Sequence, residues 1–285
     1  MLRNNKKIIL SFSLVLMFII MMTTVQVVAW EAPGMPPNKI LERFAKDEAA
    51  WGALTQFGTP ETVELAGWAG YDWIWIDAEH GAFGIDRVIS CIRAAESSGI
   101  TPIIRIPSNT RDFVQVCLDA GAYGIIFPMI NTKEDAQNAV DLAKYPPVGK
   151  RGTCPGIRVA QRMASYNDYV EWTKENILVW ALIETVDACE NIDEILAVEG
   201  LDGILLGPYD LSVDYLGEGA NPNHPEVQEM LRIVAEKTKA AGKQLIGVQS
   251  TQEWFDRGVR AFSGGGDSPY SGWKSKIEEL RKMFK

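Results

Sequence analysis

The feature that most constrains this 285-residue chain is an alternation of short apolar segments with helical patterns, repeated eight times. The apolar segments are rich in β-branched and aromatic residues. They are continuously apolar rather than alternating with polar residues, as expected for parallel strands that are covered on both faces. The predicted strands are residues 51–57, 72–77, 101–106, 123–130, 177–184, 203–207, 244–249 and 261–263.

The segments between these strands carry apolar residues at helical spacing. The predicted helices are residues 60–69, 85–97, 111–120, 132–144, 186–198, 225–241, 251–258 and 270–283, with an extra helix at 166–175. Eight strand–helix units predict an α/β fold, a single (β/α)8 TIM barrel over residues 40–285. A doubly wound open sheet usually has a Gly-rich phosphate turn after its first strand, and "GTPETV" stands there instead.

The first 29 residues have the pattern of an export signal. A basic start is followed by an uncharged stretch over residues 8–28, and "VVA" at 27–29 resembles a small-residue cleavage site. The alternative is a retained membrane anchor, because the uncharged stretch is long enough to span a bilayer. We therefore expect a periplasmic or extracellular protein, or one anchored to a membrane by this segment. Residues 30–39 form a Pro-rich lead-in.

The charge of the predicted mature chain excludes two classes of partner. Without residues 1–29, 25 basic residues remain against 37 acidic ones, a formal net charge of −12. This balance argues against nucleic acid and against anionic membrane surfaces as partners. Four cysteines, Cys91, Cys117, Cys154 and Cys189, form no CxxC pair. Three of them fall inside helical patterns, which favours free, mostly buried thiols over disulfides.

Polar side chains end several of the predicted strands. Asp77 and His80 follow the second strand in "DWIWIDAEH", Arg105 ends the third, Glu184 ends the fifth, and Asp210 follows the sixth. In a TIM barrel the carboxyl ends of all strands meet at one face, and the active site lies there. The sequence therefore predicts that these five residues share one site.

Each of these residue types suits a particular role. Glu184 and Asp210 are hard oxygen ligands of the kind that Mg²⁺ or Mn²⁺ prefers, although a salt bridge or a helix N-cap would also explain them. His80 is a candidate general base whose ring Asp77 could orient, or it is simply a structural histidine. Arg105 must meet an anion, either an acid of the protein or a substrate carboxylate.

Two further features are interpreted as structural rather than chemical. The glycine run at 264–266 could cradle a phosphate or carboxylate, but a tight turn is the favoured reading. His224, in "NPNHPEV", is interpreted as a loop or helix-entry residue without a chemical role.

The chain carries, in this order, the stretches "DWIWIDAEH", "TPIIRIP", "CLDAGAYGIIFPMI", "YPPVGKRG", "ALIET", "VEGLDGILLGPYDLS" and "NPNHPEV". With these stretches, the chain from about Ile40 to Phe284 resembles the HpcH/HpaI aldolase family, within the citrate-lyase-like and pyruvate/phosphoenolpyruvate barrel group. That resemblance implies a class II aldolase that reversibly cleaves 4-hydroxy-2-oxo acids to pyruvate and an aldehyde. It further implies a divalent cation (Mg²⁺, Mn²⁺ or Co²⁺) and a homo-oligomer, a hexamer or trimer.

The resemblance also implies roles for the residues at the strand ends. The metal-binding acids of the family match Glu184 and Asp210. Its catalytic histidine matches His80, with Asp77 as the acid of a dyad. Its arginine, which steadies the enolate oxygen, matches Arg105.

Three other positions receive roles by the same resemblance, and Asp210 receives a second role. A helix aspartate that raises the basicity of the histidine, often across a subunit boundary, matches Asp119. Backbone amides at Tyr209 and Asp210, next to Gly207, match the group that holds the pyruvate carboxylate.

The chain departs from the family pattern at positions that contact substrate. The glutamine expected two residues before the metal-binding glutamate is Leu182, and the tryptophan expected in the first strand is Leu54. The region from Thr153 to Arg162 also differs. These departures leave the substrate open, and with it two alternative functions. They are a CoA-ester lyase of the malyl or citramalyl type and an exported 2-oxo-acid binding protein without turnover.

Overall fold

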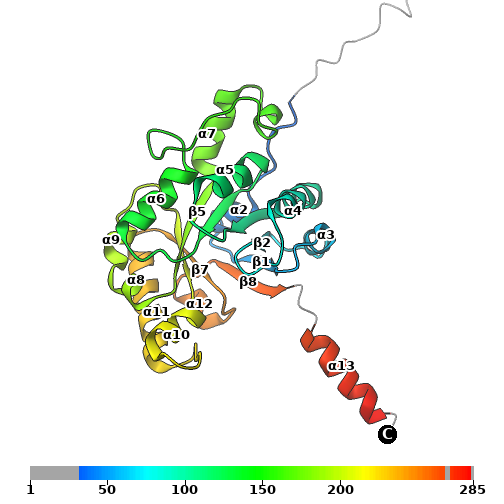
Figure 1. Ribbon diagram of the computed structural model, residues 1–285, viewed down its shortest axis with the longest axis vertical. Coiled ribbons are helices and arrows are strands. Elements are labelled where there is room, and N and C mark those ends of the chain that lie inside the picture. The colour runs from blue at the N-terminus through cyan, green and yellow to red at the C-terminus, as the bar shows by residue number, and fades with distance from the viewer. Residues whose placement is uncertain (1–31, 267–269, 284–285) are drawn as a thin grey trace, which may run out of the picture. The chain divides into compact units, whose positions relative to one another are not determined.

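The computed structural model describes residues 32–266 and 270–283. Its eight strands form one closed parallel barrel in which each strand pairs with the next along the chain and β8 pairs with β1 (Figure 1). The predicted TIM barrel is therefore confirmed. The strands are β1 (Ala50–Thr55), β2 (Trp73–Asp77), β3 (Thr101–Arg105), β4 (Gly124–Phe127), β5 (Leu178–Ile183), β6 (Gly203–Leu206), β7 (Gln244–Gly247) and β8 (Ala261–Gly266).

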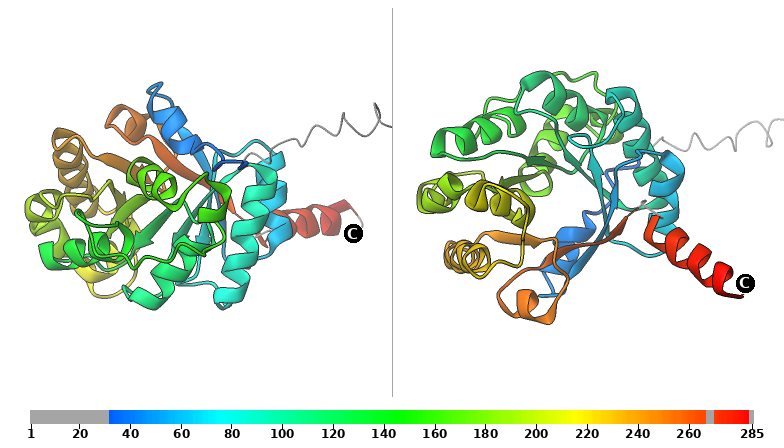
Figure 2. Two further views of the ribbon diagram at one scale, coloured as in Figure 1. Left: turned by 90° about the horizontal axis from the view of Figure 1, so that it is seen from above. Right: turned by 60° about the horizontal axis from the view of Figure 1, so that its bottom comes forward.

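Helices between the strands lie around the outside of the barrel (Figure 2). They are α3 (Pro60–Trp68), α4 (Ile85–Ser98), α5 (Arg111–Ala120), α6 (Lys133–Ala143), α7 (Tyr166–Asn176), α8 (Val186–Glu190), α9 (Ile192–Leu196), α10 (Pro208–Leu216), α11 (Pro225–Ala240) and α12 (Gln252–Asp256). A helix α2 (Lys39–Phe44) precedes β1, a 3-10 turn η1 (Ala160–Arg162) precedes α7, and α13 (Tyr270–Met283) follows β8.

Several elements differ from the predictions, and α2 was not predicted either. The helix expected at 186–198 is two short helices, α8 and α9, that meet at Asn191. Helix α10, whose first turn lies in "GPYD", was not predicted, because Gly and Pro in that order are typical of a loop; here Gly207 is the N-cap and Pro208 opens the helix. The glycine run at 264–266 is not a turn but the end of β8.

Large aromatic side chains fill the interior of the barrel. Trp73 and Trp180 are fully buried and meet edge to face, with ring centroids 5.6 Å apart. Gly52 makes room for them, because a Cβ at this position would lie 2.2 Å from the Trp73 ring. A second apolar layer, between the strands and the helices, buries mainly Ile, Val, Leu and Ala side chains. One face of each strand packs into the barrel interior and the other packs against the helices, so both faces are apolar.

The amino-terminal end of the barrel is closed by α2 and the residues just before it, from Met35 on. Asn38 caps this helix by accepting hydrogen bonds from the amides of Ile40 and Leu41. Ile40 is fully buried and belongs to the same apolar cluster as the interior tryptophans. Because this end is closed, the open face of the barrel is the one at the carboxyl ends of the strands.

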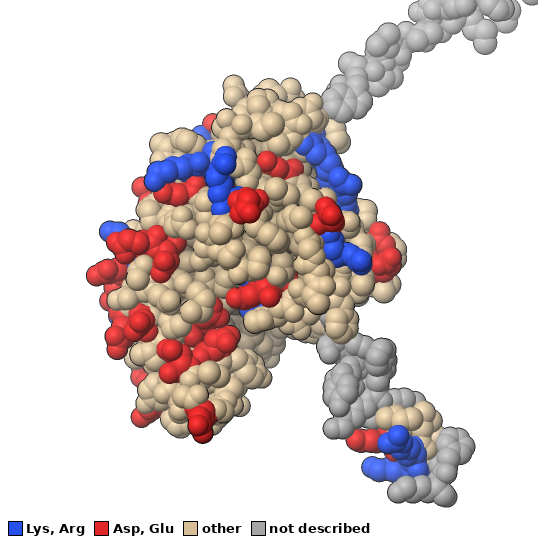
Figure 3. Space-filling model, in the orientation of Figure 1, with Lys and Arg blue, Asp and Glu red and all other residues tan. Residues whose placement is uncertain are grey.

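The predicted export signal at 1–29 lies outside the described residues and stays a prediction. Within residues 32–266 and 270–283, no helix combines the length and apolar character that a membrane crossing requires. Of the four free cysteines, Cys91 and Cys117 are buried, Cys189 is partly buried and Cys154 is exposed. Acidic side chains predominate over the face that carries α8, α9 and α10, in keeping with the negative net charge (Figure 3).

Candidate active site

A cavity of about 490 Å³ opens at the carboxyl ends of the strands. His80, Arg105, Glu184 and Asp210, predicted to share one site, all contribute to its wall. The cavity is lined by Leu54, Gln56, Trp75, His80, Arg105, Leu182, Glu184, Leu206, Gly207, Pro208, Tyr209, Asp210, Val248, Ser263, Gly265 and Gly266.

Arg105 is held on the floor of this cavity by Asp77 and Trp75. The β2–β3 register pairs Asp77 with Arg105, so both side chains leave their strands at the same level. Arg105 donates from Nε to Oδ1 of Asp77 at 2.8 Å and from Nη2 to Oδ2 at 2.6 Å, and its guanidinium lies 4.9 Å from the centre of the Trp75 ring. Burial would raise the pKa of Asp77, but these hydrogen bonds and the charge of Arg105 lower it below its usual range.

The expected contact between Asp77 and the His80 ring is therefore wrong. Both carboxylate oxygens of Asp77 are engaged by Arg105, and His80 reaches Asp77 only through its backbone amide, at 3.3 Å from Oδ1. The acid nearest to the His80 ring is Glu79, whose Oε2 lies 3.7 Å from Nε2. The side chain of His80 is 59% exposed, so the ring is accessible from the cavity.

Glu79 is a site residue that the sequence reasoning missed. Its Oε2 lies 3.0 Å from Nη1 of Arg105, but the geometry is that of an ion pair without a hydrogen bond. Burial raises the pKa of Glu79, partly offset by the charges of Arg105 and His80. The signal was present in "DAEH", where Glu79 stands between two residues that were assigned roles.

Glu184 is almost fully buried, with 4% of its surface exposed. Burial is the main cause that raises its pKa to about 7, and the nearby charges of Asp210 and Glu79 add to the effect. Its Oε1 accepts a hydrogen bond of 2.8 Å from the amide of Met129. Met129 has a φ of 53°, a strained conformation for a residue with a Cβ, and this backbone aims the amide at the carboxylate.

Asp210 is exposed and lies in the first turn of α10, whose N-terminus borders the cavity. The first amides of a helix have no acceptor inside it and carry partial positive charge. Gly207 brings this helix start close to Glu184, because a Cβ at position 207 would lie 2.7 Å from the Cβ of Glu184 and 3.0 Å from a methyl group of Leu182.

Neither alternative reading of the two predicted metal-binding acids holds. The N-caps beside them are Thr185 and Gly207, and neither Glu184 nor Asp210 makes an ion pair with Lys, Arg or His within the described ranges. These acids, with Glu79, give the cavity an excess of negative charge over the single guanidinium of Arg105. That excess, and the raised pKa of Glu184, fit a divalent cation.

The described side chains alone do not complete a metal-binding site. In the described part of the chain, no three or more His, Cys, Asp or Glu side chains are arranged to hold a metal ion. Glu184 and Asp210 would therefore supply two ligands only, as is usual for Mg²⁺, which keeps water or substrate oxygens at its other positions.

Asp119 does not belong to this cavity. It lies in the last turn of α5, where its Oδ1 is 2.7 Å from Nη2 of Arg151. The side chain of Arg151 is fully buried and stacks on the ring of Tyr145 at 4.6 Å. Within one chain Asp119 anchors Arg151; its expected role toward His80 would require a second subunit and stays a prediction.

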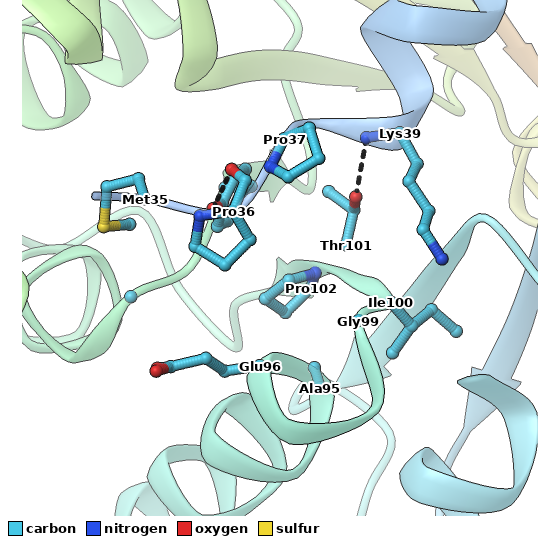
Figure 4. A pocket seen from close by; sticks show the side chains of 12 residues that line it. Met35, Pro36, Pro37, Lys39, Ala95, Glu96, Gly99, Ile100, Thr101 and Pro102 are labelled. Carbon is cyan, nitrogen blue, oxygen red and sulfur yellow. Dashed lines mark hydrogen bonds between the residues drawn. The ribbon is translucent and has the colours of Figure 1, made fainter. Parts of the chain in front are cut away.

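Another cavity, of about 210 Å³, lies near the start of β3 between the lead-in and α4 (Figure 4). Three of its polar side chains already have partners. Thr101 accepts from the amide of Lys39, Tyr123 donates to the carbonyl of Pro36, and Glu96 pairs with two arginines. His224, as expected, is a helix-entry residue and accepts from an amide in the first turn of α11.

Comparison with known proteins identifies the family of the chain. The model of the HpcH/HpaI aldolase/citrate lyase family matches residues 56–266. The chain belongs to this family. A 5-keto-4-deoxy-D-glucarate aldolase of Escherichia coli O139:H28 (strain E24377A) is 34% identical over 207 residues, which cover 73% of this chain and 80% of that enzyme. As a member of the HpcH/HpaI family, the chain is a carbon–carbon lyase of the aldolase type.

Solved structures similar to this chain have the same fold. The citrate synthase SbnG is 30% identical, with a TM-score of 0.77 over 85% of this chain and 97% of SbnG. A HpcH/HpaI aldolase/citrate lyase family protein from Burkholderia cenocepacia J2315 is 27% identical, with a TM-score of 0.78 over 87% of this chain and all of that one. Proteins of this fold thus include enzymes named for different carbon–carbon bond reactions, so the substrate must be argued from the cavity.

Proposed function

We propose that the chain is a divalent-cation-dependent class II aldolase that reversibly cleaves a 4-hydroxy-2-oxo acid to pyruvate and an aldehyde. The observation that carries the proposal is one cavity in which Glu184 and Asp210, which have no ion-pair partner among the described residues, lie with Arg105 and His80. A bound Mg²⁺, Mn²⁺ or Co²⁺ ion, with Glu184 and Asp210 among its ligands, would supply the charge that polarises the 2-oxo group.

The 2-oxo-acid half of the substrate has two complementary groups. The amides of Tyr209 and Asp210 at the start of α10 suit its carboxylate, because a helix N-terminus attracts anions. Arg105 suits the keto oxygen. Asp77 and Trp75 fix the guanidinium in advance, so it needs little reorganisation when negative charge develops next to it.

Cleavage requires one base and one site for negative charge. His80 accepts the proton of the 4-hydroxyl, and the C4–O bond becomes the aldehyde carbonyl. The electron pair of the C3–C4 bond moves to C2–C3, and the resulting enolate charge on the keto oxygen faces Arg105. A proton delivered to C3 then forms the methyl group of pyruvate. No described residue of the cavity wall is a lysine, so a Schiff-base route lacks its nucleophile there.

Exchange of the pyruvate methyl protons in D₂O tests this proposal without knowledge of the aldehyde. We expect exchange with Mn²⁺, its loss with EDTA, and a fall of about 100-fold in the Glu184→Gln variant. Glu175→Gln is a matched control, since Glu175 is exposed and lies just before β5 at the opposite end of the barrel. Exchange that survives EDTA or Glu184→Gln contradicts the proposal.

The two alternative functions give different results in companion assays. A CoA-ester lyase of the malyl or citramalyl type would cleave CoA thioesters and leave free 4-hydroxy-2-oxo acids intact. A binding protein without turnover would bind pyruvate in calorimetry but exchange none of its methyl protons. Pyruvate release from a panel of 4-hydroxy-2-oxo acids separates the proposed aldolase from both.

We also propose that the protein is exported and forms a homo-oligomer. The first part is supported by the composition of residues 1–29, and the second by the resemblance to oligomeric aldolases. Amino-terminal sequencing of the protein from a periplasmic or culture fraction tests export and cleavage after Ala29. Light scattering of the purified protein tests assembly, with a monomeric mass as the contrary result.

A further inference from the structure

The cavity has a second wall that the proposed reaction does not use. Leu54, Leu182, Leu206 and Val248 line it, and Trp75 forms its base beside Arg105. These side chains come from five different strands or strand ends. The carboxylates, Arg105 and the start of α10 account for the 2-oxo-acid half of the substrate. The aldehyde half must therefore contact this apolar wall.

Trp75 and Leu54 are partners across β1 and β2. The register places them directly opposite each other, and both side chains reach the same cavity. The aromatic ring that the resemblance places in the first strand is thus supplied here from the second strand. The indole N–H of Trp75 is buried and has no acceptor among the described residues, so the ring contributes apolar surface rather than a hydrogen bond to the protein.

The charges of the cavity exclude an anionic aldehyde. Arg105 is the only Lys or Arg among the described residues of the wall, and Asp77 and Glu79 already pair with it. In the proposed reaction, Glu184, Asp210 and the 2-oxo acid would occupy the divalent cation, and the charges of Asp77 and Glu79 together exceed the single charge of Arg105. A second carboxylate on the substrate would meet these acids without a free cation, and burial of an unpaired charge is costly.

We propose that the cavity selects an uncharged aldehyde with an apolar carbon chain, through a wall formed by Trp75, Leu54 and Leu182. This inference rests on the proposed aldolase function and adds the class of its second substrate. In the cleavage direction, the preferred substrate is a 4-hydroxy-2-oxo acid with an alkyl group on C4 and no second carboxylate.

Two aldehydes of equal chain length test the selection. Butyraldehyde and succinic semialdehyde differ in that a terminal carboxylate replaces a methyl group. In the aldol addition to pyruvate, we expect kcat/KM of the wild-type enzyme to be at least about tenfold higher for butyraldehyde, since one unpaired buried charge costs more than the 1.4 kcal/mol that a factor of ten represents.

Variants then connect the preference to the wall. Leu54→Lys places a cation opposite Trp75 and should lower the butyraldehyde-to-succinic-semialdehyde ratio at least tenfold or invert it. Leu65→Lys is the matched control, because Leu65 lies on α3 with 62% of its surface exposed and should leave the ratio unchanged. Trp75→Leu should lower the ratio, whereas Trp75→Phe, which keeps a ring, should largely retain it. A ratio within one variant is unaffected by a general loss of activity.

The outcomes separate this inference from the proposed function. Pyruvate proton exchange together with a wild-type preference for succinic semialdehyde, or with a ratio that Leu54→Lys does not move, overturns the apolar-aldehyde inference alone. Absence of proton exchange in the wild-type protein removes the proposed function and this inference with it. Exchange, a high ratio and its loss in Leu54→Lys support both.

Discussion

Replacement of Glu184 by glutamine is expected to stabilise the metal-free protein while it removes the activity. The carboxyl group has 4% of its surface exposed and a pKa raised from its ordinary 4.5 to about 7. Its ionised form is therefore unfavourable in the folded protein, at a cost of about 3 kcal/mol above pH 7. Glutamine removes the charge and keeps an oxygen that can accept from the Met129 amide.

The increase in stability on replacement of Glu184 by glutamine must be larger at high pH than at low pH. A carboxyl group with a raised folded-state pKa contributes stability that is fully present below pH 4.5 and is lost as the pH rises through about 7. The advantage of Glu184→Gln should therefore be about 3 kcal/mol at pH 8.5 and about 1 kcal/mol at pH 5. For a domain of this size, these values correspond to increases in Tm of roughly 10 °C and roughly 3 °C.

Thermal unfolding in EDTA at the two pH values measures both numbers. Glu175→Gln serves as the control and should change Tm by less than about 2 °C at either pH. An equal gain for Glu184→Gln at pH 5 and pH 8.5 would show that the effect comes from packing rather than from charge. A loss of stability in Glu184→Gln at pH 8.5 would refute the inference that the buried carboxylate destabilises the folded protein.

Four further results are expected. Asp77→Asn removes the charge that fixes Arg105 and should cost about 3 kcal/mol in urea unfolding together with most of kcat; an unaltered kcat would contradict the role of the pair. Gly207→Ala brings a Cβ to 2.7 Å from that of Glu184 and should raise KM for pyruvate about tenfold at a stability cost of about 1–3 kcal/mol. Lys144→Met removes the buried cation beside the partly buried carboxylate of Asp202 at the far end of the barrel; unfolding should become easier by about 3 kcal/mol, with kcat unaffected. Mn²⁺ binding should release about one proton at pH 6 and almost none at pH 8.5, as titration in buffers of different ionisation enthalpy would report.

The sequence predicted the barrel because its evidence is local and repeated. Each strand is a short apolar run and each helix has a 3.6-residue pattern, so eight independent signals agree. Helix α10 was not predicted because its first residues, "GPYD", are typical of a loop. Only the close approach of Gly207 to Glu184 in the folded chain fixes Gly207 as the N-cap. The break between α8 and α9 at Asn191 gave no comparable signal.

The sequence predicted which residues lie in the site, but not which of them contact each other. Strand ends converge in any TIM barrel, so His80, Arg105 and Glu184 could be placed in one cavity from their positions alone. Which acid meets which base depends on strand register. The register sets Asp77 level with Arg105, so the Asp77 carboxylate faces the guanidinium, and the acid within 4 Å of the His80 ring is Glu79.

The two ends of the barrel compensate their buried charges in different ways. At the amino-terminal end, Asp202 lies 2.8 Å from the ammonium of Lys144, so the protein itself balances the charge. At the carboxyl end, Glu184 has no such partner and carries a cost of about 3 kcal/mol at high pH. A cation present at 100 times its Kd stabilises a folded protein by about 2.7 kcal/mol, which is close to that cost. Wild-type protein saturated to this degree with Mn²⁺ at pH 8.5 should therefore reach nearly the Tm of metal-free Glu184→Gln, and Mn²⁺ should add little to the Tm of the variant.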